Sequence, residues 1–466
     1  MPRFRLSVTI LCAIILLVFY ALAALSYFVL PRPARISSPE RALAQVVSTS
    51  MTLEVGSKRI SGWGRLLSGV VEPSAVQEET DDAIHWYEEL LTVSEDPVAQ
   101  IHLAILYGET SQQDKVRAET ARWRSRPEPL PTLEVLVRTA YLENSPISDY
   151  RFRIYQAVAS ELLPTRWFRD RLIIQLLKRT PHPELAVKKE QEISLRGERL
   201  FRRHLPFIFL DFCLLLVGGA ACIKLFRRRN DLTLGQVSIP APWPGSTGVA
   251  VLLRGGALGT FLIALSFFVE GGPLVQTLLL PIISLPVLLL AQKYLFQPTG
   301  QPLGRLLGFS VDRKRLHLLF LVVLAGMAVE VAGSSLLGIA GNILHLSDHW
   351  TEWFDPDLAW GGRASVAASL FQSVVVAPFF EEIIFRGLLF TTLRRRFDWF
   401  PSALISAGIF GLAHGYGILG FLTVFFSGIV WAWMVEKTRS LVPSMIAHAA
   451  DNLIFTTGVL TLLRGG

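Results

Sequence analysis

Three charged side chains stand close together within one apolar stretch near the C-terminal end of the sequence. The segment APFFEEIIFRGLLF carries Glu381, Glu382 and Arg386. Glu382 and Arg386 are four residues apart, so on a helix they share a face and can pair, which lowers the cost of burying both charges. Glu381 is rotated by about 100° from Glu382. We expect Glu381 to keep a free carboxylate that faces a cavity; the alternative is a structural ion pair with a polar neighbour.

Two further short motifs contain the imidazoles of interest. The segment GIFGLAHGYG places Phe410 and His414 one helical turn apart, before a Gly-rich break, and MIAHAADNLI places His448 and Asn452 one turn apart. An imidazole and a carboxamide on one face can both donate hydrogen bonds to a developing oxyanion. Alternatively, the histidine can ligate a metal while its polar neighbour orients it. The adjacent Asp451 is expected either to orient a histidine or to lie on the back of the helix.

These motifs together hold a carboxylate and two imidazoles on three separate helices. A buried carboxylate with a histidine can activate water, and a His/Asn pair can stabilise a tetrahedral intermediate. This is a minimal set for peptide hydrolysis without a Ser or Cys nucleophile. The sequence contains no HExxH motif and no serine elbow. No Gly-rich phosphate loop precedes a helix, so nucleotide chemistry lacks support.

The elements that position these residues are membrane spans. The 466 residues are 51% hydrophobic and 18% charged, with a mean hydropathy of +0.43, whereas soluble domains carry about 25% charge. Ionisable groups inside a membrane helix are costly and therefore mark functional sites. We predict an all-α, polytopic bundle of about nine spans, of which the Ser402 span is short. The spans start near Leu6, Leu205, Val249, Leu274, Leu316, Ala364, Ser402, Ile418 and Leu441.

The distribution of Lys and Arg predicts the orientation of the spans. Basic residues gather at alternate ends of the nine spans, which places the N-terminus in the cytoplasm and the C-terminus outside. They lie beside apolar runs, so a membrane surface rather than nucleic acid is the expected anionic partner of a chain with net charge +7. The first apolar run, Leu6 to Leu30, is predicted to be an uncleaved signal anchor in a bacterial-type plasma membrane; the alternative is a cleaved signal peptide.

Residues 31–203 differ in kind from the rest, because they are charged and contain no long apolar run. The orientation places them outside. We expect a partly extended or loose stretch to about Ala75 and paired helices from Asp81. The apolar stripes resemble a tetratricopeptide-like hairpin that would bind a protein partner; a generic helical bundle is the alternative. His85 and His102 are read as ordinary helix residues. The predicted division is 1–30, 31–203, 204–248 and 249–466.

The three motifs, taken in order, resemble the CPBP family of intramembrane proteases, which includes CAAX prenyl endopeptidases and bacteriocin-processing and self-immunity proteins. The motifs extend from Pro378 to Asn452, and the family's helical core is expected to reach back toward Val249. The resemblance implies that Glu381 activates water with help from His414, and that His448 and Asn452 form the oxyanion site. It implies that Glu382 and Arg386 orient the site.

The resemblance leaves the cofactor open. We favour no cofactor, because Asn452 is a poor ligand and a good hydrogen-bond donor. The alternative is Zn²⁺ held by Glu381, His414 and His448, a set of three ligands that suits a catalytic zinc site. Glu330, within the Leu316 span, belongs to none of the motifs and is expected to be structural or to line the same cavity.

The predicted function is therefore an intramembrane endopeptidase that acts on a membrane-embedded or membrane-anchored protein or peptide. The alternative function is a non-catalytic scaffold or a bacteriocin self-immunity factor that binds a protein through residues 31–203. A transporter ranks third, since no clear internal repeat is present. The sequence does not identify the substrate or whether that substrate is prenylated.

The charge distribution generates a topology prediction. A reporter protein that is active only in the cytoplasm, fused after Arg126, should stay inactive, because residues 31–203 are expected outside. The same reporter fused after Arg396 should be active and serves as the control. Activity of the Arg126 fusion would contradict the assigned orientation of the first span.

Overall fold

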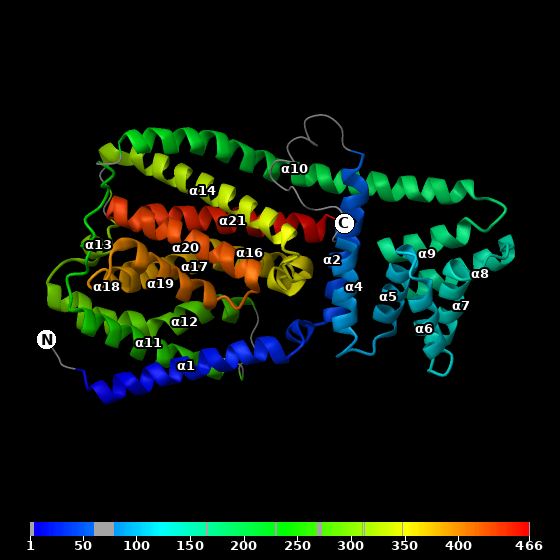
Figure 1. The fold of residues 1–466 in the computed structure, drawn as a ribbon, viewed down its shortest axis with the longest axis horizontal. Coiled ribbons are helices and arrows are strands. Elements are labelled where there is room, and N and C mark those ends of the chain that lie inside the picture. The colour runs from blue at the N-terminus through cyan, green and yellow to red at the C-terminus, as the bar shows by residue number, and fades with distance from the viewer. Residues whose placement is uncertain are drawn as a thin grey trace. The chain divides into compact units, whose positions relative to one another are not determined.

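The structure is a computed structural model that describes residues 4–59, 79–164, 166–228, 231–266, 268, 273–309, 311, 313–346 and 348–465. Every regular element within these ranges is a helix, as Figure 1 shows, which confirms the predicted all-α class. The chain forms two compact units, which are described separately. Unit 1 comprises Met1–Val29 and Phe207–Val459, and unit 2 comprises Leu30–Pro206 and Leu460–Gly466.

Seven of the described helices are long and apolar enough to cross a membrane. A spanning helix needs about 20 apolar residues because the hydrocarbon core is about 30 Å thick. Each of the seven corresponds to a predicted span, so the chain is an integral multi-pass membrane protein. They are α1 (Leu6–Val29), α10 (Glu184–Arg227), α11 (Gly245–Ser266), α12 (Pro273–Ala291), α14 (Leu316–Ile343), α20 (Ile418–Thr438) and α21 (Val442–Arg464).

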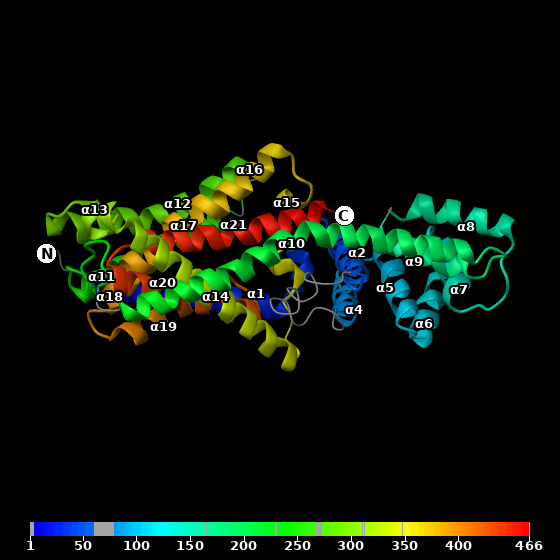
Figure 2. The ribbon, with the colours of Figure 1, turned by 90° about the horizontal axis from the view of Figure 1, so that it is seen from above.

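The two remaining predicted spans are less regular, and they carry Glu381 and His414. The first runs without a break from α16 (Arg363–Phe371) to α18 (Thr391–Leu393) through two wide π-helical stretches. These are η6 (Gln372–Val376) and η7 (Glu382–Phe390), separated by α17 (Ala377–Glu381). The second is α19 (Trp399–Leu412), whose 14 residues agree with the short span expected at Ser402. Figure 2 shows α16 and α17 beside α12.

Shorter elements connect these helices. Gly415, at a φ of +65°, makes the left-handed turn that ends α19 before α20 begins at Ile418; glycine adopts this conformation without a steric penalty. The other short elements of unit 1 are η2 (Gln292–Phe296), η3 (Gln297–Thr299), α13 (Leu303–Leu306), η4 (Arg313–Arg315), η5 (Trp350–Glu352) and α15 (Pro356–Trp360).

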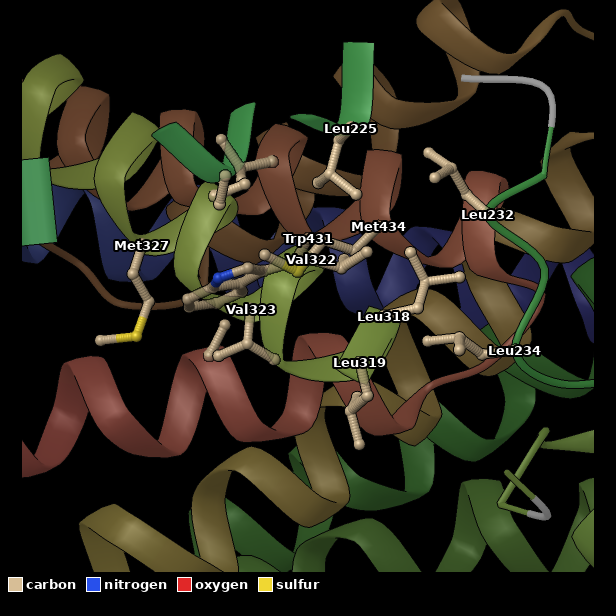
Figure 3. Close-up of a cluster of buried hydrophobic side chains, with 14 of the residues drawn as sticks. Leu225, Leu232, Leu234, Leu318, Leu319, Val322, Val323, Met327, Trp431 and Met434 are labelled. Carbon is tan, nitrogen blue, oxygen red and sulfur yellow. The ribbon is translucent and has the colours of Figure 1, made fainter. Parts of the chain in front are cut away.

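A dense core of unit 1 lies where α14 packs against α20. Figure 3 shows Trp431 and Met434 of α20 among Val322 and Val323 of α14. Close approach of the two helices depends on a glycine: a Cβ on Gly333 would lie 2.0 Å from the ring of Phe426. Small residues at such crossings allow membrane helices to pack closely. This core fixes the position of α20.

Unit 2 is a set of helices in which sequence neighbours pack against one another. The three helices predicted from Asp81 onward are confirmed as α4 (Glu79–Leu90), α5 (Pro97–Glu109) and α6 (Gln113–Trp123). Their predicted apolar stripes are buried, with Tyr87 and Leu106 fully inaccessible. The tetratricopeptide-like interpretation stays a prediction. The other elements are η1 (Arg32–Arg35), α2 (Pro39–Ser57), α7 (Leu130–Tyr141), α8 (Asp149–Leu162), α9 (Trp167–Leu177) and the first part of α10.

The expectation of a loose segment up to Ala75 is wrong for its first half. Residues Pro39–Ser57 form the helix α2, most of whose side chains are buried. Its Ser and Thr residues are compatible with a helix because their hydroxyls bond within it, as Thr52 Oγ1 does to the Ser48 carbonyl at 2.6 Å. Pro39 begins the helix, where a missing N–H costs nothing. Residues 60–78 of the predicted loose segment lie outside the described residues.

The last residues of the chain belong to unit 2. The Gln45 side-chain amide donates to the Leu463 carbonyl at 2.6 Å, and Arg203 donates to the Gly465 carbonyl at 3.1 Å. The side chain of Leu463 is buried, with 3% of its surface exposed. The carbonyls of Leu463 and Gly465 thus accept hydrogen bonds from side chains of α2 and α10, which precede them by more than half of the chain.

His102 lies in the core of unit 2 as a neutral, structural side chain. Its Nδ1 is 2.9 Å from the Tyr87 hydroxyl, and its ring stacks on Phe168 at 3.8 Å between centroids. Burial, together with the positive charge of Arg166, lowers the pKa of His102 from 6.5 to about 3. The pKa in the folded protein is thus below that in the unfolded chain, so protonation favours unfolding.

This shift generates a pH prediction for unit 2. The stabilisation is fully present above pH 6.5 and is lost as pH falls from 6.5 toward 3, by about 2 kcal/mol at pH 5. His102→Gln, which does not titrate, should be less stable at pH 7 but should lose less stability between pH 7 and pH 5. Hydrogen exchange of α5 and α9 peptides in the full chain measures both. Equal losses in the two proteins would contradict the neutral buried imidazole.

Candidate active site

The centre of the candidate site is the side chain of Arg386, which is buried inside unit 1. Arg386 and Glu382 are both fully inaccessible, and Arg386 Nη1 lies 2.9 Å from Glu382 Oε1. The predicted i,i+4 pair is therefore confirmed. The guanidinium also lies 4.3 Å from the ring centroid of Phe410 and 4.9 Å from that of Trp431. Pairing and cation–π contacts together replace the water that the buried charge has lost.

Space for this guanidinium is provided by a glycine on α20. A Cβ added to Gly428 would lie 3.1 Å from Arg386 Nη2 and 2.8 Å from the Cβ of Ala407 on α19. A larger side chain at this position would push against both the charge and the neighbouring helix. The site is thus built where α19, α20 and η7 meet.

His448 of α21 lies between the two glutamates. Its Nδ1 is 3.3 Å from Glu382 Oε1, and its Nε2 is 3.7 Å from Glu381 Oε2. The imidazole stacks on the indole of Trp431, with ring centroids 4.0 Å apart and planes inclined by 19°. Stacking on Trp431 and the Nδ1 contact with Glu382 together restrict rotation of this ring.

The two adjacent glutamates have different surroundings, as the sequence predicts. Glu382 is inaccessible and committed to Arg386 and His448, whereas 19% of the Glu381 side chain is exposed. Only Glu381 therefore has a carboxylate that a water molecule or a substrate can reach. The helix thus buries the carboxylate of Glu382 in the pair with Arg386 and leaves the carboxylate of Glu381 partly exposed.

Phe410 and His414 come from the last turn of α19 and the residues after it. The Phe410 ring is buried and lies 4.7 Å from the His414 ring, and His414 Nδ1 is 2.8 Å from the Phe410 carbonyl. Because a carbonyl only accepts, Nδ1 carries the proton and the Nε2 of neutral His414 is an acceptor. The imidazole in contact with Glu381 is that of His448; among the described residues no such contact links His414 to Glu381.

Asn452 lies one turn beyond His448 on the same face of α21, as its spacing predicts. Its Nδ2 donates to the Ser373 backbone carbonyl at 2.7 Å, and the nearby Thr456 hydroxyl donates to Ser373 Oγ at 3.3 Å. A cavity of about 180 Å³ adjoins this contact. It is lined by Glu352, Trp353, Phe354, Asp355, Leu358, Ser369, Ser373, Phe455, Thr456 and Val459.

Trp431 and Ser406 also belong to the site, and neither was predicted from the sequence. Trp431 stands in an apolar span and looks like a lipid-facing or core residue, although Gly428 three residues earlier marks a close approach on nearly the same face. Ser406 donates to the Phe385 carbonyl within η7 at 2.9 Å. The spacing of Ser406 and Phe410, four residues, is the signal that could have placed both on the face that meets η7.

Of the two other acidic residues singled out from the sequence, Asp451 lies apart from these contacts, whereas Glu330 interacts electrostatically with Glu382 and Arg386. Asp451 is exposed on α21 within unit 1 and forms no described contact with His448, so it lies on the back of the helix. Glu330 is buried on α14, with 3% of its surface exposed. Neither residue contributes a described hydrogen bond to Glu381, Glu382 or His448.

The described side chains do not gather as a ligand set for a metal ion. In the part of the chain that the structure describes, no three His, Cys, Asp or Glu side chains gather as metal ligands would. His414 Nδ1 lies on a carbonyl and His448 Nδ1 on the Glu382 carboxylate, so Nε2 is the nitrogen of each ring that could bind an ion. A catalytic zinc site requires three ligands about 2 Å from one point, and Glu381, His414 and His448 are not arranged in this way.

The fold and the site define an integral membrane protein with a buried glutamate, arginine and histidine cluster among its C-terminal helices. Residues 363–454 match the family model described as "Type II CAAX prenyl endopeptidase Rce1-like". Residues 363–454 are therefore similar to this family, which confirms the resemblance stated above. The match begins at Arg363, so an extension of the domain toward Val249 stays a prediction.

A curated relative supports the same assignment. The chain is 31% identical over 88 residues to the candidate membrane peptidase YdiL of Bacillus subtilis (strain 168), which is 19% of this chain and 36% of the relative. The match thus spans about a third of the relative's length. No solved structure matches the chain.

The different surroundings of the two glutamates generate a mutational prediction. Arg386→Ala leaves Glu382 buried without its partner, and loss of one partner of a buried pair costs about 3–5 kcal/mol in soluble proteins. We expect a clear fall in the yield of folded protein. Glu381→Gln is nearly isosteric at the more open position, so folded yield should stay near that of the wild type.

Size-exclusion chromatography in detergent measures the folded yield of both variants. Glu382→Gln serves as the matched control, since it differs from Glu381→Gln by one position and removes the buried pair. Equal loss of folded protein in Glu381→Gln and Glu382→Gln would mean that Glu381 is a structural residue.

Proposed function

We propose that the protein is an intramembrane endopeptidase that hydrolyses a peptide bond by means of a water molecule activated by Glu381. The observation that carries the proposal is the pair of adjacent glutamates, of which only Glu381 is open, beside the imidazole of His448. The match of residues 363–454 to a CAAX prenyl endopeptidase family supports peptide hydrolysis as the reaction class. The substrate class is a membrane-embedded or membrane-anchored protein or peptide.

In the proposed reaction, the Glu381 carboxylate accepts a proton from water while the water oxygen attacks the scissile carbonyl carbon. A carboxylate within hydrogen-bond reach of a water molecule can act as its general base. His414, whose neutral Nε2 is an acceptor, orients the water by accepting its second proton in a hydrogen bond. The products of this step are a tetrahedral intermediate and a protonated Glu381.

His448 then carries the proton toward the leaving group. Its Nδ1 faces the Glu382 carboxylate, so Nδ1 carries a proton and Nε2 is the nitrogen available to receive another. Transfer from Glu381 across the gap of 3.7 Å gives an imidazolium that the Glu382 carboxylate stabilises. This imidazolium and the Asn452 amide donate to the oxyanion. Collapse of the intermediate breaks the C–N bond, and the amine leaves with the proton from His448.

The proposal is tested with purified protein in vesicles and a comparison of membrane peptides. Peptides released in the presence of wild-type protein should be absent with Glu381→Gln at equal folded amount. His448→Ala and Asn452→Ala should each slow the cleavage; loss of one oxyanion donor costs about 10²–10³ in rate in a serine protease, and we use only that scale. Unchanged release with Glu381→Gln would contradict the mechanism, and no release by the wild type would favour a scaffold.

The same preparation tests the metal-free form of the mechanism. Because the proposed mechanism uses no metal, cleavage should survive a strong chelator, and metal analysis should find no stoichiometric Zn²⁺. His448→Ala and Asn452→Ala should have the same metal content as the wild type. One tightly bound Zn²⁺ per chain that disappears in His448→Ala would overturn the mechanism.

A further inference from the structure

The carbonyl of Ser373 has lost both donors that its own helix could supply. In an α-helix this carbonyl would accept from the N–H of Ala377, but the Ala377 N–H donates to the Gln372 carbonyl, five residues back. The next amide along the chain is that of Pro378, which has no N–H. The wide turn of η6 and the proline together leave the Ser373 carbonyl without a donor at the positions where a helix provides one.

The side chain of Asn452 fills this gap. Its Nδ2 lies 2.7 Å from the Ser373 carbonyl oxygen and comes from a different helix, α21. An unsatisfied carbonyl is expensive in a membrane protein because no bulk water is available to it. The hydrogen bond from the neighbouring helix supplies the donor that its own helix lacks.

The second wide turn of the same helix is fastened in a comparable way. Within η7, the Phe385 carbonyl accepts the hydroxyl of Ser406 on α19 at 2.9 Å. Each π-helical stretch thus has one carbonyl that accepts from a side chain of a neighbouring helix. π-Helical turns occur often at functional sites, and here Glu381 and Glu382 lie between the two fastened positions.

We propose that Asn452 replaces the missing N–H of Pro378 and fastens α21 to the η6 turn, and that Ser373 and Pro378 are thereby positioning residues for Asn452. This structural function is independent of the reaction. A carboxamide has two N–H groups, so donation of one to Ser373 fixes the amide plane and leaves the second for the oxyanion. That second consequence rests on the proposed function.

The fastening also sets the register of α21. His448 precedes Asn452 by one turn on the same face and contacts Glu382. With Asn452 held on Ser373, α21 cannot rotate or slide against the helix from α16 to α18 without breaking this bond. The contact of His448 with both glutamates therefore depends on the N–H that Pro378 lacks.

A double-mutant cycle tests the structural part in the Glu381→Gln background, where no catalysis is involved. Asn452→Leu keeps a similar size, removes the donor and excludes a replacing water. It should lower the thermal unfolding temperature in detergent by about 2–4 °C. Pro378→Ala returns an N–H to the helix at the position next to the gap, so the loss caused by Asn452→Leu should become smaller in this background.

Ser406→Ala provides the matched control, because it removes the comparable bond to Phe385, which an N–H at 378 cannot reach. Its effect should add to that of Pro378→Ala without coupling. If Asn452→Leu left the unfolding temperature unchanged, Asn452 would have no structural function. If Asn452→Leu lowered the unfolding temperature equally in the Pro378→Ala background, the proline would not be the reason for the bond between Asn452 and Ser373. Either result overturns the proposal.

Activity separates the positioning part from the proposed function. Pro378→Ala, with Glu381 intact, should lower kcat severalfold with little change in KM, since Asn452 is released from Ser373 while the substrate-binding surface is unchanged. An unchanged kcat would overturn the positioning of Asn452 by Ser373. If no protein of the set, wild type included, hydrolyses peptides, the proposed function fails while the outcome of the stability cycle stands.

Discussion

Burial of one guanidinium within a bundle of membrane helices is the constraint around which unit 1 is arranged. A charge at this depth is tolerated only if it is paired and enclosed. Arg386 receives the Glu382 carboxylate on one side and the faces of Phe410 and Trp431 on the other. These partners come from three helices, so the burial of Arg386 brings η7, α19 and α20 together. Gly428 supplies the space that this meeting requires.

The same constraint explains why the two glutamates differ. The Glu382 carboxylate is consumed by Arg386 and His448, and the helix then turns Glu381 to a more open position. A more open carboxylate thus lies beside a paired one, and its described ionic contact is the one with His448 at 3.7 Å. Glu381 stays available for reaction because Arg386 pairs with Glu382 instead. His448, stacked on Trp431, is the element that both carboxylates share.

Much of this arrangement follows from residue spacing, and some of it does not. The spacing of Glu382 and Arg386 predicted their pair, and apolar run lengths predicted the spans, because both are local properties of a helix. The contact of His448 with Glu381 joins α21 to α17 and could not be derived from either segment alone. The implied assistance of His414 to Glu381 has no described contact behind it. Likewise, helix α2 was missed because its Ser and Thr residues bond within the helix, which composition does not reveal.

The wide turns in the helix from α16 to α18 were also beyond prediction from spacing. Pro378 signals a missing N–H, but the sequence does not say which carbonyl loses its donor or which helix compensates. Only when Ala377 is seen to donate five residues back does the carbonyl of Ser373 become the one in question. A proline in a membrane helix is thus a local signal whose consequence is decided by a distant segment.

Unit 2 is closed by residues 460–465, through the bonds of Gln45 to Leu463 and of Arg203 to Gly465. During synthesis, residues 31–206 emerge long before these partners exist. The unit therefore cannot reach its final state while the ribosome is still translating the spans that follow. The hydrogen bond of Gln45 can form only after α21 has been inserted. Folding of unit 2 is therefore completed late, and it depends on the correct insertion of α21, the helix that carries His448.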